Sequence, residues 1–336
     1  MDELVLGIES SCDETSAAVV QGGRRVLSNV IWTQMDIHRQ YGGVVPELAS
    51  RRHLEAVLPV VDRALGEAEV GGRDLNCISV VHGPGLLGAL LVGLTAAKAL
   101  SLAWEVPVLG VHHIVAHVYA NFLGGEEPEF PLVCLVVSGG HTEILFMPGH
   151  GRFEVLGRTR DDAAGEAFDK TARLLGLGYP GGREIDRLAQ KGDPEAVPLP
   201  RTYLEEGSLD FSFSGVKTAV IHARDEAGRA YSLEDLAASF QKAVVDVLVD
   251  KTFAAAERYR VRQVLLAGGV AANSELRRRT NAEGAKRGIR VLLPPPALCT
   301  DNAAMVASAG TYLYRMGVRS SLSLNAAASL QIPACG

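Results

Sequence analysis

The sequence predicts an α/β protein built from two related halves, each with its own sheet. Three observations support this prediction. Apolar strand patterns alternate with helix patterns, a three-strand module occurs twice, and glycine turns follow several of the strands. Such alternation is typical of helices layered on a sheet. A length of 336 residues is sufficient for two domains of ordinary size.

The three-strand module occurs first at the start of the chain. Residues 4–9 have the apolar pattern of a buried strand, and a polar turn at residues 10–15 follows them. Strand patterns at residues 17–20 and 25–31 flank a pair of glycines, which favours a hairpin. The chain therefore begins with strand, polar turn, strand, hairpin and strand.

The same module recurs in the second half. A buried strand pattern at residues 132–137 is followed by the turn SGGHT at residues 138–142. Strand patterns at residues 143–147 and 153–156 then flank another hairpin. Because the chain opens twice in the same way, we expect a duplicated two-domain fold with a cleft between the halves.

Further helices and strands complete each half. Helix patterns lie at residues 46–66, 86–104 and 303–316 and begin again at residue 274, and strand patterns lie at residues 77–81, 106–111, 264–267 and 289–293. The most apolar helix, 86–104, starts after a glycine turn and is interrupted by Thr95, Lys98 and Ser101. It is therefore expected in a large core and not in a membrane.

The composition is that of an ordinary globular protein, with 47% hydrophobic and 21% charged residues. A net charge of -6 argues against nucleic-acid binding by bulk electrostatics, so such a partner would need a local basic patch or a partner subunit. The acidic start, MDELVLGIE, lacks the features of a secretory signal. Five cysteines without a C-x-x-C pair suit reduced thiols, and we expect a cytoplasmic protein.

The spacing of His113 and His117 points to a metal. They follow the strand at residues 106–111, and on a helix they would share one face a turn apart. A Zn or Fe site needs at least one more ligand, and Asp301, in the polar segment CTDNAA, is the best-placed candidate. The alternative is a pair of partly buried helix histidines whose nitrogens bind backbone carbonyls.

The glycine turns SGGHT, YPGG and AGGVAAN favour a nucleotide site. Glycine lets backbone N–H groups approach phosphate, and helix N-termini add positive potential. Each turn alone would equally suit an ordinary α/β fold. Asp13 and Glu14 end the first strand, where an open sheet presents its reactive residues, although a self-capping polar turn is the alternative.

Three charged or polar segments have less specific interpretations. The acidic segment at residues 161–170 suits a solvated helix face. Ser214 and Lys217 could point into the cleft or belong to a loop and helix cap. The densest basic cluster suits an RNA footprint or an exposed helix face, and its members are Arg277, Arg278, Arg279, Lys286, Arg287 and Arg290.

Nine segments between about residue 4 and residue 310 form a distinctive ordered set. They are GIESSCDETSAAVV, GGVVPELASRRHLE, HGPGLLGALLVG, VHHIVAH, LVVSGGHTE, DDAAGEAFDKTARLLGLGYPGG, LDFSFSGVKTA, AGGVAANSELR and CTDNAAM. Together they resemble the TsaD family of bacterial tRNA threonylcarbamoyladenosine transferases, once labelled O-sialoglycoprotein endopeptidases. The resemblance implies the actin-like, sugar-kinase-like (ASKHA, RNase H-like) fold with a central nucleotide cleft. We place the N-terminal subdomain at residues 1–112 plus 304–336 and the C-terminal one at residues 113–303.

The resemblance also implies the site residues. His113, His117 and Asp301 match the family's metal ligands, with Fe or Zn as the ion. The positions matching those that hold the nucleotide or adenylate are Val136, Val137, Ser138, Gly139, Gly140, Asp169, Gly182, Asp186 and Asn273. ATP or ADP could occupy the same cleft.

The implied reaction transfers the threonylcarbamoyl group from threonylcarbamoyl-AMP to the exocyclic amine of the adenosine next to the anticodon, in tRNAs reading codons that begin with A. AMP leaves, and the mixed anhydride supplies the driving force. We expect Asp13 or Glu14 to accept the amine proton. The implied partners are tRNA, a paralogous actin-like subunit of the TsaB type and an ATPase of the TsaE type, without a membrane.

The sequence departs from the family at Arg183, where many relatives carry proline, and in the tail after Gly317, which ends in an unpatterned Cys335.

Three other functions are alternatives to the transferase. A zinc protease would need H-E-x-x-H, yet Ile114 follows His113. A kinase of the same fold would use the glycine turns but not the metal residues, and a scaffold would bind nucleotide without transfer.

Overall fold

The computed structural model describes residues 2–225 and 231–332, which form two compact units. The described part of unit 1 is residues 2–128 and 297–332, and unit 2 is residues 129–296 without 226–230. The boundaries expected from the sequence, after His112 and before Ala304, both lie inside unit 1. Helix α4 (His113–Tyr119) packs against helix α10 (Ala303–Arg315), and this contact keeps both segments in one unit.

Unit 1 contains a five-stranded mixed sheet in the order β3-β2-β1-β4-β5. Its strands are β1 (Leu4–Glu9), β2 (Glu14–Gln21), β3 (Arg25–Thr33), β4 (Cys77–Gly83) and β5 (Val108–His112). The first three form the predicted antiparallel module, while β4 pairs in parallel with both β1 and β5. The carboxyl ends of these parallel strands therefore share one edge of the sheet.

Unit 2 repeats this sheet, in the order β10-β9-β6-β7-β8. Its strands are β6 (Leu132–Val137), β7 (Thr142–Gly149), β8 (Arg152–Arg158), β9 (Gln263–Ala267) and β10 (Arg290–Leu292). Strands β6, β7 and β8 are antiparallel, and β9 pairs in parallel with β6 and β10. The two sheets have the same topology, so the predicted duplicated α/β fold is confirmed.

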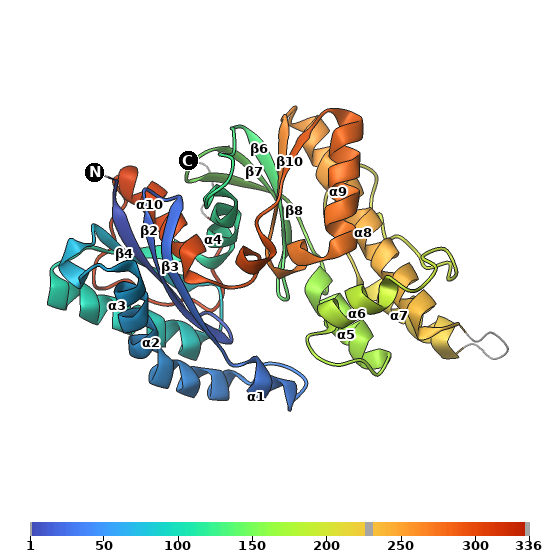
Figure 1. Ribbon diagram of the computed structural model, residues 1–336. Coiled ribbons are helices and arrows are strands. Elements are labelled where there is room, and N and C mark those ends of the chain that lie inside the picture. Colours follow the sequence, from blue (N-terminus) through green and yellow to red (C-terminus); the bar gives the residue numbers. More distant parts are fainter. Residues whose placement is uncertain (1, 226–230, 333–336) are drawn as a thin grey trace. The chain divides into compact units, whose positions relative to one another are not determined.

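Helices cover both faces of the sheet in unit 1 (Figure 1). Their bounds are α1 (Met35–Arg39), α2 (Pro46–Ala68), α3 (Leu87–Trp104), α4 (His113–Tyr119) and α10 (Ala303–Arg315), with short 3-10 turns at η1 (Gly72–Asp74), η2 (Ala120–Phe122) and η4 (Pro296–Leu298). Buried residues of α2 and α3 share a core cluster with Leu6 and Ile8 of β1. Gly7 faces α10, where a Cβ atom would lie 2.1 Å from the Ala303 carbonyl oxygen.

Helix α3 is the one described helix long and apolar enough to cross a membrane by length and composition. One face of it, including Leu90 and Leu94, is buried in unit 1, where α3 packs against α2 and β4. Its other face exposes Leu87, Leu91 and Leu102. Helix α3 is thus a core helix on one face and an apolar surface on the other.

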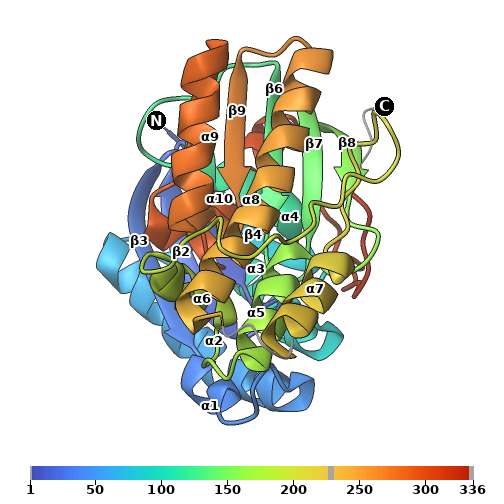
Figure 2. The same cartoon turned by 90° about the vertical axis from the view of Figure 1, so that its right-hand side faces the viewer.

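Unit 2 is organised around α8 (Leu233–Arg258), which the sequence analysis does not predict (Figure 2). The other helical elements are α5 (Ala164–Leu174), α6 (Gly181–Ala189), α7 (Ser214–Asp225), η3 (Gly269–Ala272) and α9 (Ser274–Arg287). Helix α8 contacts α6, α7 and α9 and the strands β6 and β9. Since it is buried on most sides, it lacks the polar stripe that marks an amphipathic helix.

Candidate functional site

Helix α4 brings His113 and His117 together immediately after β5. The backbone N–H of Ile114 donates to Nδ1 of His112, 3.2 Å away, so the last residue of β5 caps the helix. Within α4, the rings of His113 and His117 are edge to face with centroids 4.7 Å apart. Both rings are buried, so the predicted helical pair is present and faces the interior of unit 1.

Asp301 reaches the two histidines from the segment that leads into α10. Its Oδ1 lies 3.1 Å from Nε2 of His117 and 3.8 Å from Nε2 of His113. The next residue, Asn302, caps α10 by accepting a hydrogen bond from the Met305 backbone N–H. The structure therefore brings together the three residues predicted as metal ligands, each offering one ligand atom within 4.8 Å of the others.

The chemistry of this group fits a divalent metal. Two imidazole nitrogens and a carboxylate oxygen converge, which is a donor set that Zn and Fe accept. The buried Nδ1 of His117 has no hydrogen-bond partner among residues 2–225 and 231–332. The alternative of two histidines bound to backbone carbonyls therefore does not describe His117. A metal at this position would satisfy Nε2 atoms that otherwise face only Asp301.

Glu9 is a member of the site that the sequence analysis did not identify. This carboxylate is fully buried at the end of β1. Its Oε1 accepts a hydrogen bond from the Ser11 backbone N–H at 2.6 Å, and its Oε2 lies 3.2 Å from Nδ1 of His113. Such a carboxylate holds the proton on Nδ1 and leaves Nε2 for a metal. A glutamate inside a buried strand indicates that some partner must compensate its charge, but the sequence does not indicate which residue that partner is.

The charges around His113 favour its protonated form in the metal-free protein. Burial lowers the pKa of His113, but the negative charges of Asp301 and Glu9 outweigh it and raise the pKa to about 9. Metal binding must therefore displace a proton from this ring at neutral pH.

Asp13 and Glu14, predicted as catalytic residues, lie where the turn after β1 meets β2: Asp13 ends the turn and Glu14 is the first residue of β2. Burial, together with the negative charges of Asp13 and Asp301, raises the pKa of Glu14 to about 9. The Thr33 hydroxyl donates to Oε1 of Glu14 at 2.9 Å. The repulsion from Asp301 places this pair of carboxyls in the same electrostatic neighbourhood as the candidate metal ligands.

His53 of α2 fixes the turn that carries these two carboxyls. This fully buried side chain lies 2.8 Å from the Thr15 hydroxyl through Nδ1 and 3.0 Å from the Cys12 carbonyl oxygen through Nε2. The two contacts flank Asp13 and Glu14 on either side. Because both partners are distant in sequence from α2, no local pattern identified His53.

The predicted nucleotide turns lie in unit 2, at the ends of β6 and β9. Val136 and Val137 end β6, and the Ser138 hydroxyl accepts a hydrogen bond from the His141 backbone N–H at 3.2 Å. A Cβ atom on Gly139, Gly140 or Gly269 would meet nothing within 4 Å. The backbone of these turns therefore borders open space, as a nucleotide cradle requires.

The other predicted nucleotide residues also lie in unit 2, and several hold its turns in place. Asp169 accepts a hydrogen bond from the Gly181 backbone N–H at 2.7 Å, directly before Gly182. Asp186 accepts from the Ser274 hydroxyl at 2.6 Å. Asn273 caps α9 by accepting from the Leu276 backbone N–H. These contacts connect α5, α6 and the start of α9 into one framework.

The segment with Ser214 and Lys217 and the basic cluster around α9, each of which had two possible interpretations, both contact acidic residues. Ser214 donates to Asp161 at 2.7 Å, and Lys217 pairs with Asp162 at 2.8 Å, so both side chains bind the segment before α5. The basic cluster on α9 is largely paired with acidic residues. The pairs are Arg278 with Glu275, Arg279 with Asp246, and Arg287 with Glu283. These contacts favour a loop and cap for the first segment and a charge-paired helix face for the second.

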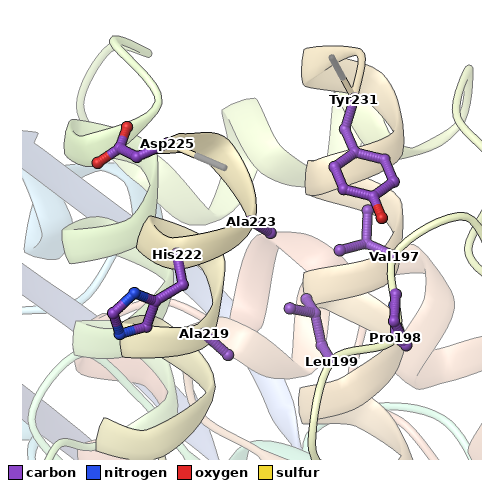
Figure 3. A pocket seen from close by; sticks show the side chains of 8 residues that line it. All are labelled: Val197, Pro198, Leu199, Ala219, His222, Ala223, Asp225 and Tyr231. Atoms are coloured by element: carbon purple, nitrogen blue, oxygen red, sulfur yellow. The ribbon is translucent and has the colours of Figure 1, made fainter. Parts of the chain in front are cut away.

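A cavity of about 440 Å³ lies elsewhere in unit 2, beside α7 (Figure 3). It contains none of the predicted site residues, and its lining is Val197, Pro198, Leu199, Ala219, His222, Ala223, Asp225 and Tyr231. Cys12, Cys77, Cys134 and Cys299 form no disulfide within the described part of the chain, and Cys335 is outside it. Neither feature adds a residue to the site.

Comparison with known proteins decides the family. The model of the family described as "TsaD: tRNA N6-adenosine threonylcarbamoyltransferase" matches residues 25–308. The chain belongs to the TsaD family. The family and the enzyme class predicted from the sequence are thereby confirmed.

Curated relatives in this family match the chain over nearly its full length. A tRNA N6-adenosine threonylcarbamoyltransferase of Symbiobacterium thermophilum is 62% identical over 329 residues, covering 97% of this chain and 96% of the relative. The protein of the same description from Bacillus subtilis is 54% identical over 335 residues, covering 98% of this chain and 96% of the relative. This TsaD chain therefore matches nearly the full length of both relatives.

Solved structures confirm the fold at low sequence identity. A full-length HypF, in its phosphate- and nucleotide-bound form, has a TM-score of 0.64 at 14% identity over 94% of this chain, which spans 46% of the HypF chain. Component A of the (R)-2-hydroxyglutaryl-CoA dehydratase of Acidaminococcus fermentans has a TM-score of 0.54 at 12% identity, covering 94% of this chain and 99% of that chain. The actin-like, sugar-kinase-like architecture predicted from the sequence agrees with these neighbours.

Proposed function

We propose that this TsaD chain transfers the threonylcarbamoyl group from threonylcarbamoyl-AMP to the exocyclic amine of the adenosine 3' of the anticodon. The acceptors are tRNAs that read codons beginning with A, and AMP is released. The observation that carries the proposal is the buried convergence of His113, His117 and Asp301 in a member of this family. The mixed anhydride already supplies the driving force, so the protein has to orient it and handle one proton.

His113, His117 and Asp301 are proposed to hold one divalent metal, Fe or Zn. When bound, such a metal supplies a Lewis acid that polarises a carbonyl or phosphoryl oxygen. Neighbouring residues hold the three metal ligands in place before the metal binds. Glu9 orients His113, and the cap at Asn302 sets the direction of the segment that carries Asp301.

Asp13 is proposed as the base that accepts the proton of the adenine amine. Both carboxyls at the junction of this turn with β2 were candidates, but in the metal-free chain burial and the charges of Asp13 and Asp301 raise the pKa of Glu14 and favour its protonated form. A protonated Glu14 can donate a hydrogen bond but cannot serve as the base. His53 is proposed to position the pair, because its two contacts fix the ends of the turn.

The AMP portion of the donor is proposed to bind at the glycine turns of unit 2, which would also accept ATP or ADP. The turn 138–140 and Gly269 offer open backbone, and Gly182 is the second residue of α6, directly after the Gly181 that contacts Asp169. Asp186 and Asn273 hold the neighbouring framework. In this arrangement the phosphate is bound by backbone N–H groups.

Partner proteins are proposed to supply what the surface of this chain lacks. The net charge of -6 and the paired charges on α9 leave little excess positive charge for tRNA, so tRNA binding is proposed to need a partner subunit. A paralogous TsaB-type subunit is proposed to cover exposed leucines of α2 and α3, two helices that pack together, and a TsaE-type ATPase is proposed to complete the assembly. These leucines are Leu54, Leu58, Leu87, Leu91 and Leu102.

The test is a transfer assay in extract from cells depleted of this protein. The purified chain is mixed with threonylcarbamoyl-AMP and a tRNA reading A-starting codons, and the digested nucleosides are weighed by mass spectrometry. Wild type and the control His222→Ala, an exposed residue of α7, should restore the threonylcarbamoyladenosine mass, whereas His113→Ala should not.

Two other results of this assay would change the proposal. Restoration by His113→Ala would mean that the metal residues are dispensable for transfer. No restoration by wild type, in extract that another TsaD renders competent, would sink the transferase proposal and leave sugar phosphorylation as the next activity to measure.

A further inference from the structure

The C-terminal segment, residues 320–330, lies along β4 and β5 of unit 1 although its sequence has no helix or strand pattern. The Ser320 backbone N–H donates to the Val108 carbonyl at 3.2 Å. Further along, the Ala327 N–H donates to the His82 carbonyl at 2.8 Å, and the Gly85 N–H donates to the Ala328 carbonyl at 3.1 Å. Backbone hydrogen bonds therefore fix the segment from the start of β5, at Val108, to the carboxyl end of β4, at His82 and Gly85.

Close packing accompanies these bonds. A Cβ atom on Gly83 would lie 2.3 Å from the Ala327 carbonyl oxygen and 3.2 Å from the Leu330 Cβ atom. Leu324 packs against the hydrophobic core of unit 1, and a Cβ atom on Gly110 would lie 2.7 Å from its Cδ2. Glycine at these two positions of β4 and β5 is what lets the segment approach so closely.

His112 connects this segment to the helix of the metal residues. Its Nδ1 accepts a hydrogen bond from the Ile114 N–H, so Nε2 carries the proton and donates to the Leu330 carbonyl oxygen at 3.1 Å. The side chain is only 5% exposed. One imidazole therefore caps α4 and binds the C-terminal segment at the same time.

We propose that residues 327–330 form a strap that, through His112, sets the position of the N-terminus of α4 and hence of His113. His112 is a positioning residue, because it is proposed to act on the metal site only through the helix start. The inference rests on the proposed metal site. On this proposal, the C-terminal segment, which matches no sequence motif, increases the affinity of the site for its metal.

Two full-length variants separate the strap from the cap. His112→Asn keeps an oxygen that can accept from the Ile114 N–H, since asparagine is a strong helix cap, but it has no atom at the position of Nε2 to reach Leu330. Gly83→Ala leaves His112 intact and places a methyl group where the strap lies. His222→Asn on α7 of unit 2 is the matched control.

The measurement is titration of the metal-free proteins with Co²⁺ alone, followed by its absorption bands and by calorimetry. Each strap variant should bind Co²⁺ about tenfold more weakly than wild type, the lower end of the range for residues behind metal ligands. The double variant should be no weaker than either single one, because both changes break the same contact. Circular dichroism and Tm are recorded alongside, since a purely structural strap would lower Tm without changing Co²⁺ affinity in the folded protein.

The remaining outcomes are distinguishable. If wild type binds Co²⁺ and both variants match it, the strap is wrong while the metal site stands. Additive losses in the double variant would also overturn the strap, because the two changes would then act by separate routes. If wild type itself binds no Co²⁺, the metal site fails and the strap fails with it.

Discussion

At the scale of single residues, the site depends on a carboxylate that no local pattern identifies. Glu9 is read from the sequence as the last residue of a buried strand, and its role appears only when β1 and α4 are in contact. His113, His117 and Asp301 could be predicted because helical spacing and a family motif mark them. Glu9 and His53 could not, since each acts through contacts with residues far away in the chain.

Substitution of Glu9 should weaken metal binding more than it weakens the fold. Glu9→Gln keeps an oxygen for the Ser11 N–H and loses the charge beside His113, so Co²⁺ should bind about tenfold more weakly. Glu9→Ala removes both contacts, and the loss should approach about a hundredfold. Equal affinity of Glu9→Ala and wild type, measured by the same titration, would show that Nδ1 of His113 needs no carboxylate.

Glu14 should make the metal-free protein less stable as the pH rises. Its pKa in the folded chain lies above that of an unfolded glutamate, so its contribution to stability is complete at low pH and is lost as the pH rises toward about 9. Glu14→Gln, which carries no titrating proton, should flatten this dependence. We expect Tm of wild type to fall by at least about 2–4 °C more than that of Glu14→Gln between about pH 5 and pH 9.

The control for this pH series is Glu55→Gln, on the exposed face of α2. It should follow wild type at every pH, because its carboxyl only pairs with Arg52 on an exposed helix face, where an ion pair contributes little to stability. A Glu14→Gln variant whose Tm falls as steeply as that of wild type would show that another group causes the pH dependence.

At the scale of elements, prediction succeeds where turn residues bound a short apolar run. The three-strand modules were predicted from such runs, with a polar turn and a hairpin between them. Helix α8 was not, because most of its sides are buried and its sequence carries no polar stripe. The C-terminal segment was also missed, since backbone hydrogen bonds fix it and its side chains show no periodicity.

The contact between β1 and α10 should control the position of Asp301. Gly7→Ala would place a methyl group 2.1 Å from the Ala303 carbonyl oxygen, so the start of α10 has to move. We expect a loss of about 1–3 kcal/mol in the free energy of unfolding, the usual range for overpacking a core. Weaker Co²⁺ binding should accompany it, because Asp301 lies just before α10.

Gly66→Ala on α2 is the matched control for this element, because a Cβ atom there would meet nothing within 4 Å. It should leave Co²⁺ affinity unchanged and stabilise the helix slightly. If Gly7→Ala unfolds no more easily than Gly66→Ala, β1 and α10 are not as closely packed as described.

At the scale of the whole molecule, the duplicated fold has divided its chemistry between the copies. The link from β1 to β2 carries Asp13 in its turn and Glu14 as the first residue of β2, while the corresponding turn after β6 carries Gly139 and Gly140. The same topology therefore presents carboxyls in unit 1 and open backbone in unit 2. This division could be predicted from the sequence because the two modules align strand by strand and differ at the turn.

The residues proposed to bind the metal lie in unit 1, and those proposed to bind the nucleotide lie in unit 2. Each bound ligand should therefore protect the unit that binds it against hydrogen exchange. Zn²⁺ should slow exchange in α4 and at the start of α10, and AMP should slow it in residues 136–140 and around Gly269. At a hundred times the dissociation constant, binding adds about 2.7 kcal/mol of stability to the folded form that binds. Slowed exchange at residues 136–140 with Zn²⁺ alone would show that the metal residues and the glycine turns are energetically coupled. Protection by Zn²⁺ that is confined to unit 1 would show that each copy of the fold binds its ligand independently.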